Sequence, residues 1–486
     1  MEWNSILFKN KGLVTLPGLQ PAFFVDLHLD QVVQTIVEGK EQYALIPYFY
    51  QPLIDRGTIL YRQEIFAELE DRQLIAYIRQ FAIGMEAVRQ AIPMDGKYYY
   101  DYQKEWMVLD AVLIYGETIH LLSEQLLKHK LESTGLVSFR DSLIAYCHSE
   151  KFIYLYEEAS QLQKELVAIR YILRIKGLTV QVLPDEEKED YTAGIKEVVR
   201  RFSGDNVGDY HYHFPKTVDT NHVEAHILDG VASLYPEIFG RLKNFCQKNT
   251  DFLEQGVVVF DREIQFYMAY HEYKEMLKAH GLRCCIPDVT DLERDIYVYN
   301  SFDIALAANF VKEQRPIVCN DFLLKSNERI FVVTGPNQGG KTTFARTFGQ
   351  LHYLACLGCP VPGRKARLFV FDRLFTHFER EENLKDQRSK LEDDLIRIHR
   401  MISEASAASI IILNEIFSST ALQDAVFLSK KIMEKIVELD AYGVWVTFIE
   451  EVVNFGPTCS VDGAMRNVCC RPRSGSKYLS RGIYTF

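Results

Sequence analysis

The feature that most constrains the fold of this chain is a glycine-rich stretch within residues 330–344. A short apolar run ends at Gly335, and Gly340, Lys341 and Thr342 begin five positions later. This G-x-x-x-x-G-K-T spacing is typical of a loop that joins a buried strand to a helix and holds phosphates. It predicts an α/β domain with a nucleotide-binding loop.

Each residue type in this loop has a chemical reason to be there. Glycines let the backbone turn tightly and point its N–H groups at phosphate oxygens, and the following helix adds the positive end of its dipole. Lys341 is expected to reach the β- and γ-phosphates, and the Thr342 hydroxyl to bind Mg²⁺. A glycine-rich turn that matches by chance is the alternative, but the strand before it and the helix after it favour a site for ATP and Mg²⁺. The expected nucleotide-binding residues are Gly335, Pro336, Asn337, Gln338, Gly339, Gly340, Lys341, Thr342 and Thr343.

A second polar pair follows an apolar run at residues 410–413. The pair is Asn414 and Glu415, at a place where nucleoside triphosphatases carry an acidic metal ligand and then a glutamate that activates water. Glu415 and Lys341 are therefore expected to be catalytic, and Thr342 and Asn414 to face the metal. Because asparagine brings no negative charge, we expect weaker Mg²⁺ binding and slower hydrolysis. Alternatively, this run is only a core strand and Asn414 caps the residues that follow.

Composition bounds the class of protein. The chain has 486 residues, of which 48% are hydrophobic and 25% charged, which is ordinary for a protein of two to four globular domains. No apolar run approaching 18 residues and no secretory signal is recognised, so a cytoplasmic protein without a membrane span is expected. The pair Cys356 and Cys359 lacks a second pair to complete a zinc site, which favours reduced thiols.

The net charge of −11 argues against a uniformly basic nucleic-acid surface. It still permits a local basic patch for DNA. A solvated charged face is an equally good interpretation of the basic residues concerned. They are Lys176, Lys188, Lys196, Arg200, Arg201 and Lys216.

Hydrophobic periodicity predicts an α and α/β protein. We expect a helical core with long lever helices over 1–176, a small β insertion over 177–225, returning lever helices over 226–285, and a P-loop α/β domain over 286–486. Single helices are expected over 65–88, 106–127 and 138–175, and strands over 179–183 and 202–216. Buried parallel strands are expected at 329–333, 368–371, 410–413 and 444–448, with helices at 341–357, 389–406 and 421–438 between them.

Several of these segments resemble the MutS family of DNA mismatch-repair ATPases. The loop reads Thr-Gly-Pro-Asn-Gln-Gly-Gly-Lys-Thr-Thr and is similar to the family's T-G-P-N-M-x-G-K-S-T, with the Pro336-Asn337 pair its most specific feature. Residues 372–376 resemble the family's D-R-I-F-T segment, and residues 387–395 its G-R-S-T-F-x-x-E-M segment. Residues 413–424 resemble its D-E-x-x-R-G-T-S segment.

The resemblance implies a clamp-like protein with composite ATPase heads in a homodimer that acts on DNA. It also implies a catalytic role for Ser389, because the equivalent serine of the family reaches the partner's nucleotide. The alternative is that Ser389 is a helix N-cap. Two departures stand out: the family's mismatch-reading Gly-x-Phe-Tyr-Glu stretch is not recognised, and Phe448 stands where the family has a histidine.

Three functions follow from these observations. The leading hypothesis is a dimeric, MutS-like ATPase that grips duplex or branched DNA without reading mismatches itself. The second is a scaffold protein that nucleotide binding switches with little turnover, which Asn414 and Phe448 favour. The third, an ABC- or SMC-type ATPase unrelated to DNA repair, is disfavoured by Asn337 and by residues 372–376.

Overall fold

The structure is a computed structural model of the chain. It describes residues 3–9, 18–93, 100–176, 179–185, 222–291, 295–325, 328–336, 339–378, 390–417, 420–449, 458–462, 467–468 and 482–483. The chain divides into two compact units. We call residues 76–130 and 140–257 the helical unit, and residues 2–75, 131–139 and 258–486 the sheet unit.

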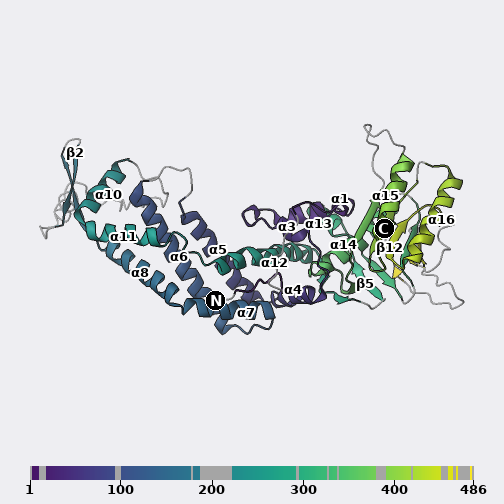
Figure 1. Cartoon of the computed structure of the whole chain (residues 1–486), viewed down its shortest axis with the longest axis horizontal. Coiled ribbons are helices and arrows are strands. Elements are labelled where there is room, and N and C mark those ends of the chain that lie inside the picture. The colour runs from purple at the N-terminus through teal and green to yellow at the C-terminus, as the bar shows by residue number, and fades with distance from the viewer. Residues whose placement is uncertain are drawn as a thin grey trace, which may run out of the picture. The chain divides into compact units, whose positions relative to one another are not determined.

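The helical unit is built around α6 (Asp101–Lys128), a helix of 28 residues. It packs against α8 (Glu150–Val167) and α11 (Pro236–Lys248), as Figure 1 shows. The helices approach closely at Gly116, where an added Cβ would lie 2.2 Å from the ring of Tyr156. The unit also contains α10 (His222–Leu234) and parts of α5 (Arg72–Ala91) and α7 (Thr134–Cys147).

Although no membrane span is expected from the sequence, α6 is long and apolar enough to cross a membrane. An 18-residue window of this helix reaches a mean hydropathy of 1.2. The core helix of a soluble protein passes the same test, and 56% of this window is buried in the structure.

Two of the predicted single helices are wrong, because each is divided. The helix expected over 65–88 is α4 (Arg56–Glu68) and α5, and the carboxylate of Asp71 restarts the second by accepting the N–H of Gln73 at 2.7 Å. The helix expected over 138–175 is α7 and α8, and Ser149 caps the start of α8.

The end of that second segment is a strand. Residues 171–176 form β1 (Tyr171–Lys176), which pairs residue for residue with β2 (Thr179–Pro184) in an antiparallel hairpin. Val182 of β2 packs against Gly230 of α10, so the hairpin gains a helical support that residue periodicity alone does not reveal. The further strand pair expected over 202–216 lies outside the described residues.

A parallel sheet dominates the sheet unit. Five described strands lie in the order β10-β11-β12-β7-β13, and each neighbouring pair is parallel. Both faces of β7, β11 and β12 are buried, which explains why their sequences are almost continuously apolar. The strands are β7 (Ile330–Thr334), β10 (Leu374–Phe378), β11 (Ile410–Asn414), β12 (Tyr442–Val446) and β13 (Thr458–Asp462).

Helices cover this sheet on both faces (Figure 1). Helices α15 (Lys390–Glu404) and α16 (Leu422–Glu438) form one core with the sheet residues Val332, Leu413 and Trp445. Helix α14 (Lys341–Cys356) packs against β11 and β12, and its Gly349 lies against Ile412. The chain is thus a mixed helical and α/β protein, as the sequence predicts.

The prediction that residues 368–371 form a strand of the parallel sheet is wrong, because the strand found there belongs to another sheet. Residues 365–369 form β9 (Lys365–Phe369), which belongs to a second sheet in the order β4-β9-β5-β6. The chain changes sheets at Asp372, whose carboxylate accepts the hydroxyls of Ser406 and Ser409 at 2.6 and 2.7 Å. The strand beside β11 is therefore β10. The other strands of the second sheet are β4 (Asp288–Thr290), β5 (Ile296–Ser301) and β6 (Asn320–Leu324).

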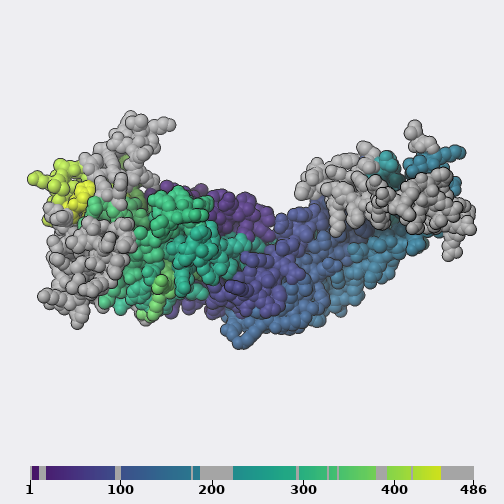
Figure 2. Space-filling model, turned by 180° about the vertical axis from the view of Figure 1, so that it is seen from behind, coloured from purple at the N-terminus to yellow at the C-terminus, as the bar shows by residue number. Residues whose placement is uncertain are grey.

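Segments from both ends of the sequence build the sheet unit. In Figure 2 the N-terminal residues, in purple, lie side by side with the green residues of the second half. Arg62 of α4 shows this contact, since its buried guanidinium donates to the carbonyls of Leu7 and Leu357. The remaining elements are α1 (Phe23–Asp26), α2 (Leu29–Val37), η1 (Glu41–Tyr43), α3 (Ile46–Phe49), α12 (Gln255–Ala279), α13 (Ile304–Glu313), β3 (Cys284–Cys285), β8 (Val361–Pro362), β14 (Asn467–Val468) and β15 (Gly482–Ile483).

Candidate functional site

The glycine-rich loop, residues 335–340, joins the end of β7 to the start of α14. Gly335 has φ 140° and Gly340 has φ 77°, a backbone region that glycine enters without a Cβ clash. The N–H of Gly339 donates to the carbonyl of Pro336 at 3.2 Å, which tightens the turn. The loop therefore delivers the amino end of a 16-residue helix to the carboxyl edge of a parallel sheet.

Lys341 is the charged centre of this loop. Its ammonium donates to the carbonyl of Gly335 at 2.8 Å and to that of Pro336 at 3.4 Å. It also lies 3.2 Å from Oε1 of Glu415. The lysine side chain is only 4% exposed, whereas that of Glu415 is 26% exposed. The cation is thus held inside the loop by groups that a more anionic ligand could replace.

The end of β11 supplies the second half of the site. Asn414 is buried, and its side-chain oxygen accepts the hydroxyl of Thr342 at 3.1 Å. Glu415 follows in a left-handed backbone conformation, with φ 54°, and its N–H donates to the carbonyl of Val446 at 2.9 Å. This unusual conformation turns the chain at the strand end, where Glu415 reaches Lys341.

The donor set can be tested against the groups that such a site takes. A buried ammonium at a helix amino terminus suits phosphate oxygens. The hydroxyl of Thr342 and the amide oxygen of Asn414 are oxygen ligands that suit Mg²⁺, but neither carries a charge. Within the described part of the chain, no three His, Cys, Asp or Glu side chains gather as a metal site. The residues present therefore fit a phosphate well and a metal ion only in part.

Some predicted site residues lie outside the described residues. They are Asn337, Gln338 and Ser389. Of the basic patch, only Lys176 is described, at the end of β1. Thr343 is described in the first turn of α14, and its carbonyl accepts the hydroxyl of Thr347 at 2.7 Å. Phe448 is 50% exposed just beyond β12.

Residues of the segment 372–376 and its neighbour His377 join β10 to two helices beside the site. The hydroxyl of Thr376 donates to Asp26 at 2.6 Å, joining β10 to α1. The next residue, His377, is buried, and its Nε2 lies 2.8 Å from a carboxylate oxygen of Asp394 in α15. These contacts hold β10 between a helix from each end of the sequence.

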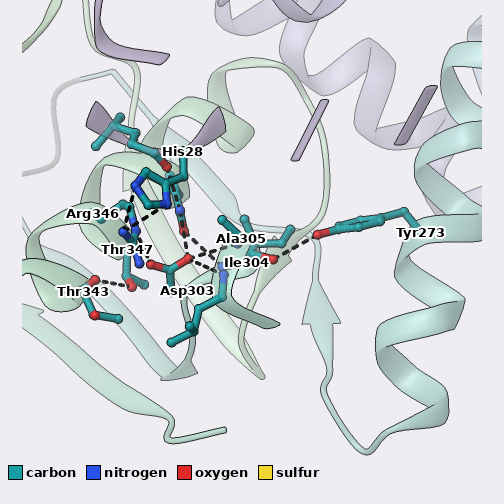
Figure 3. A network of polar contacts seen from close by, with 11 residues as sticks. His28, Tyr273, Asp303, Ile304, Ala305, Thr343, Arg346 and Thr347 are labelled. Atoms are coloured by element: carbon teal, nitrogen blue, oxygen red, sulfur yellow. Dashed lines mark hydrogen bonds and ion pairs between the residues drawn. The ribbon is translucent and has the colours of Figure 1, made fainter. Parts of the chain in front are cut away.

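Sequence reasoning missed a buried polar network behind the loop. Asp303, His28 and Arg346 come from α13, the α1–α2 turn and α14, and they converge in Figure 3. Burial and the neighbouring Arg346 lower the pKa of His28 below 6.5. A signal existed, since an aspartate directly before a helix indicates a cap and an arginine inside a buried helix requires a partner.

Comparison with known proteins gives a domain-level match. Residues 331–465 match the family model of MutS domain V. The DNA mismatch repair protein MutS of Thermotoga neapolitana is 31% identical over 140 residues, which are 29% of this chain and 18% of that protein. The MutS protein of Zymomonas mobilis is 34% identical over 131 residues, which are 27% of this chain and 15% of that protein. The matched part is thus less than a fifth of each of these two relatives.

Proposed function

We propose, on the premise that residues 331–465 match MutS domain V, that the chain is a member of the MutS family that binds ATP with Mg²⁺ at the glycine-rich loop and hydrolyses it slowly. In this proposal residues 286–486 are a P-loop ATPase domain. The observation that carries it is the placement of Lys341, a buried cation in a glycine-rich loop between a buried strand and a helix. This placement unites the charge, the N–H donors and the helix dipole that bind phosphate.

The roles of the residues follow from their contacts. Lys341 binds the phosphate oxygens in exchange for Glu415, and the loop N–H groups bind the remaining charge. Thr342 and Asn414 would hold Mg²⁺, which would supply positive charge to the phosphates. Glu415, released from Lys341, orients the attacking water and accepts its proton. With a neutral Asn414 the metal is held less firmly, so turnover is slow.

Hydrolysis measurements test this proposal directly. Steady-state ATP hydrolysis is measured for the wild type and for Lys341→Ala, each alone and with duplex, junction or single-stranded DNA. We expect slow, DNA-sensitive turnover that Lys341→Ala abolishes. Equal hydrolysis by both proteins would place the activity elsewhere.

DNA is the proposed partner of the whole protein. The relatives are described as DNA mismatch repair proteins, and the hairpin carries Arg174 and Lys176 on a fully exposed strand. Because the chain is acidic overall, its DNA footprint must be local. Titration of the protein with the same DNA molecules at several salt concentrations tests this proposal, since DNA binding that is independent of salt would contradict a phosphate-based contact.

A homodimer with a shared site is the proposed assembly. A phosphate-binding loop covers one side of the γ-phosphate, so a donor from a second subunit would complete the site, and Ser389 directly precedes α15. Chains carrying Lys341→Ala and Ser389→Ala, each inactive alone, are mixed. A shared site regains hydrolysis, because the mixed dimer keeps one intact pair of residues. No recovery at concentrations where light scattering detects ATP-dependent dimers contradicts a role of Ser389 across the dimer.

The second candidate is a scaffold protein switched by nucleotide binding with little turnover. Asn414 favours it, since the metal-facing position lacks a charge. Nucleotide-dependent dimerisation without measurable hydrolysis would select this function over the first.

A further inference from the structure

Asp303 is the centre of the buried network behind the glycine-rich loop. Its carboxylate caps α13 by accepting the N–H groups of Ala305 and Leu306 at 3.0 and 2.9 Å. It also accepts the side-chain amide of Gln350 at 3.1 Å and forms an ion pair with Arg346. The Asp303 side chain is 1% exposed, so this charge depends entirely on these partners.

Arg346 extends the network to His28. Its Nη1 lies 3.2 Å from Nδ1 and 3.3 Å from Nε2 of the imidazole ring (Figure 3). Because Nη1 is almost equidistant from the two ring nitrogens, it lies over the face of the imidazole ring and not along one lone pair. A neutral ring can lie against a guanidinium in this way, whereas a protonated ring would be repelled by it. His28 has a left-handed backbone with φ 53°. The contact therefore favours a neutral histidine.

The network supports the part of α14 that follows the loop. Arg346 lies five residues after Lys341 on the same helix. Thr347, beside it, donates its hydroxyl to the carbonyl of Thr343 in the first helical turn. On the other side, Tyr273 of α12 donates to the carbonyl of Ile304 at 2.9 Å. Asp303 at the start of α13 and His28 in the α1–α2 turn thus contact α14 at Arg346, and α12 in turn supports α13.

We propose that Arg346 is a positioning residue for the glycine-rich loop and that it holds α14 in place only while His28 is neutral. This inference rests on the proposed nucleotide binding. A protonated His28 would place two cations in contact, so Arg346 would keep Asp303 and lose His28. The first turn of α14 would then be held less firmly, and its nucleotide would bind more weakly.

The charges around His28 set the direction of the pH effect. Burial and Arg346 disfavour the protonated ring, whereas Asp303, Asp30 and Asp26 favour it. The first two prevail and lower the pKa below 6.5. In the folded protein the ring is therefore neutral at neutral pH and is protonated only as pH falls through its lowered pKa. The contact is present at neutral pH and is lost through that more acidic range.

The test measures binding of N-methylanthraniloyl-ADP with Mg²⁺ at about pH 7.5 and about pH 5.5. We expect the wild type to bind more weakly at the lower pH, by a factor of up to about ten, because part of the His28 ring is then protonated. His28→Asn should bind as the wild type does at the higher pH and lose most of this dependence. Asparagine tolerates the left-handed backbone, and its side-chain oxygen can accept from Arg346 at either pH.

Arg346→Lys provides a second arm. Lysine keeps a charge for Asp303 but offers one nitrogen in place of the fork, so it should bind weakly at both pH values and respond little to acid. Equal acid weakening in the wild type and in His28→Asn overturns the inference, because the nucleotide's own titration would explain both. Of the three proteins, only Arg346→Lys is expected to bind the nucleotide weakly at both pH values.

The binding measurements distinguish failure of the proposed nucleotide binding from failure of the proposed role of His28. A wild type that binds no nucleotide at either pH contradicts the proposed function and, with it, this inference. A wild type that binds equally at both pH values contradicts only the role of His28. If Arg346→Lys fails to fold, shown by loss of a cooperative thermal transition, the comparison of the wild type with His28→Asn decides alone.

Discussion

The ends of β7 and β11 lie at the same edge of one parallel sheet, but they differ in charge. Beyond β7, Lys341 is a buried cation at a helix start, and the glycines have the backbone that the loop needs. At the end of β11, the residue proposed to face the metal is Asn414, whose amide oxygen accepts the Thr342 hydroxyl. In the proposed site, the phosphate-binding half thus has its buried cation, while the metal-binding half lacks a charge. On this proposal, binding and turnover are expected to be separable by mutation.

The largest effect is expected from removing the cation of the phosphate-binding half. Lys341→Ala deletes the only side-chain cation that the structure places within the described part of the loop. Nucleotide affinity should fall about 100-fold or more, because a charge-assisted contact to phosphate is lost. Fluorescent ATP titration measures it, with Lys431→Ala on the exposed face of α16 as the matched control. Equal affinity of the two variants would contradict the loop assignment.

Changing Glu415 separates the two halves. Glu415→Gln should lower turnover about 100-fold or more, because the water loses its base. Nucleotide should bind at least as tightly as before, since Lys341 no longer has a carboxylate to give up. Single-turnover hydrolysis and equilibrium binding measure both quantities. Glu438→Gln, on the exposed end of α16, is the control, and wild-type turnover in Glu415→Gln would exclude Glu415 as the base.

The packing of α14, the helix that begins with Lys341, can be tested through the pH dependence of stability. Burial lowers the pKa of His352 in α14 to about 4 from 6.5. The neutral ring therefore stabilises the fold above pH 6.5, and at about pH 5 the free energy of unfolding should fall by about 2 kcal/mol. Denaturant unfolding of the wild type and of His352→Phe measures this loss. His352 packs on Phe348 and Phe369, so phenylalanine keeps the aromatic contacts. An identical pH dependence of both proteins would exclude His352 as its source.

The smallest effect is expected from adding a negative charge at residue 414. Asn414→Asp should raise Mg²⁺ affinity about tenfold, equivalent to about 1.4 kcal/mol, and increase turnover. Metal titration of the nucleotide complex measures the first and steady-state hydrolysis the second. Asn320→Asp, in the second sheet, is the control for a buried added charge. Unchanged metal affinity would show that residue 414 does not face the metal.

Local sequence was enough for the strand, loop and helix around Lys341, because glycine spacing and apolar runs act over a few residues. It failed at β9 and β10, where hydroxyls of Ser406 and Ser409 fix the turn at Asp372 from more than thirty positions away. It failed also at β1, whose strand depends on pairing with β2. The contact between Lys341 and Glu415, and the network of His28, Asp303 and Arg346, join distant parts of the sequence. Such contacts require the fold.

Calorimetric titration of the wild type with ATP, once with Mg²⁺ and once with a chelator, distinguishes phosphate binding from metal binding at the proposed site. A complete phosphate half and an uncharged metal half predict binding in both conditions, with affinities within about tenfold of each other. The same titration of Lys341→Ala should show no binding in either condition. Wild-type binding that disappears in the chelator, at every ATP concentration reached, would contradict this account, because the metal would then hold the nucleotide.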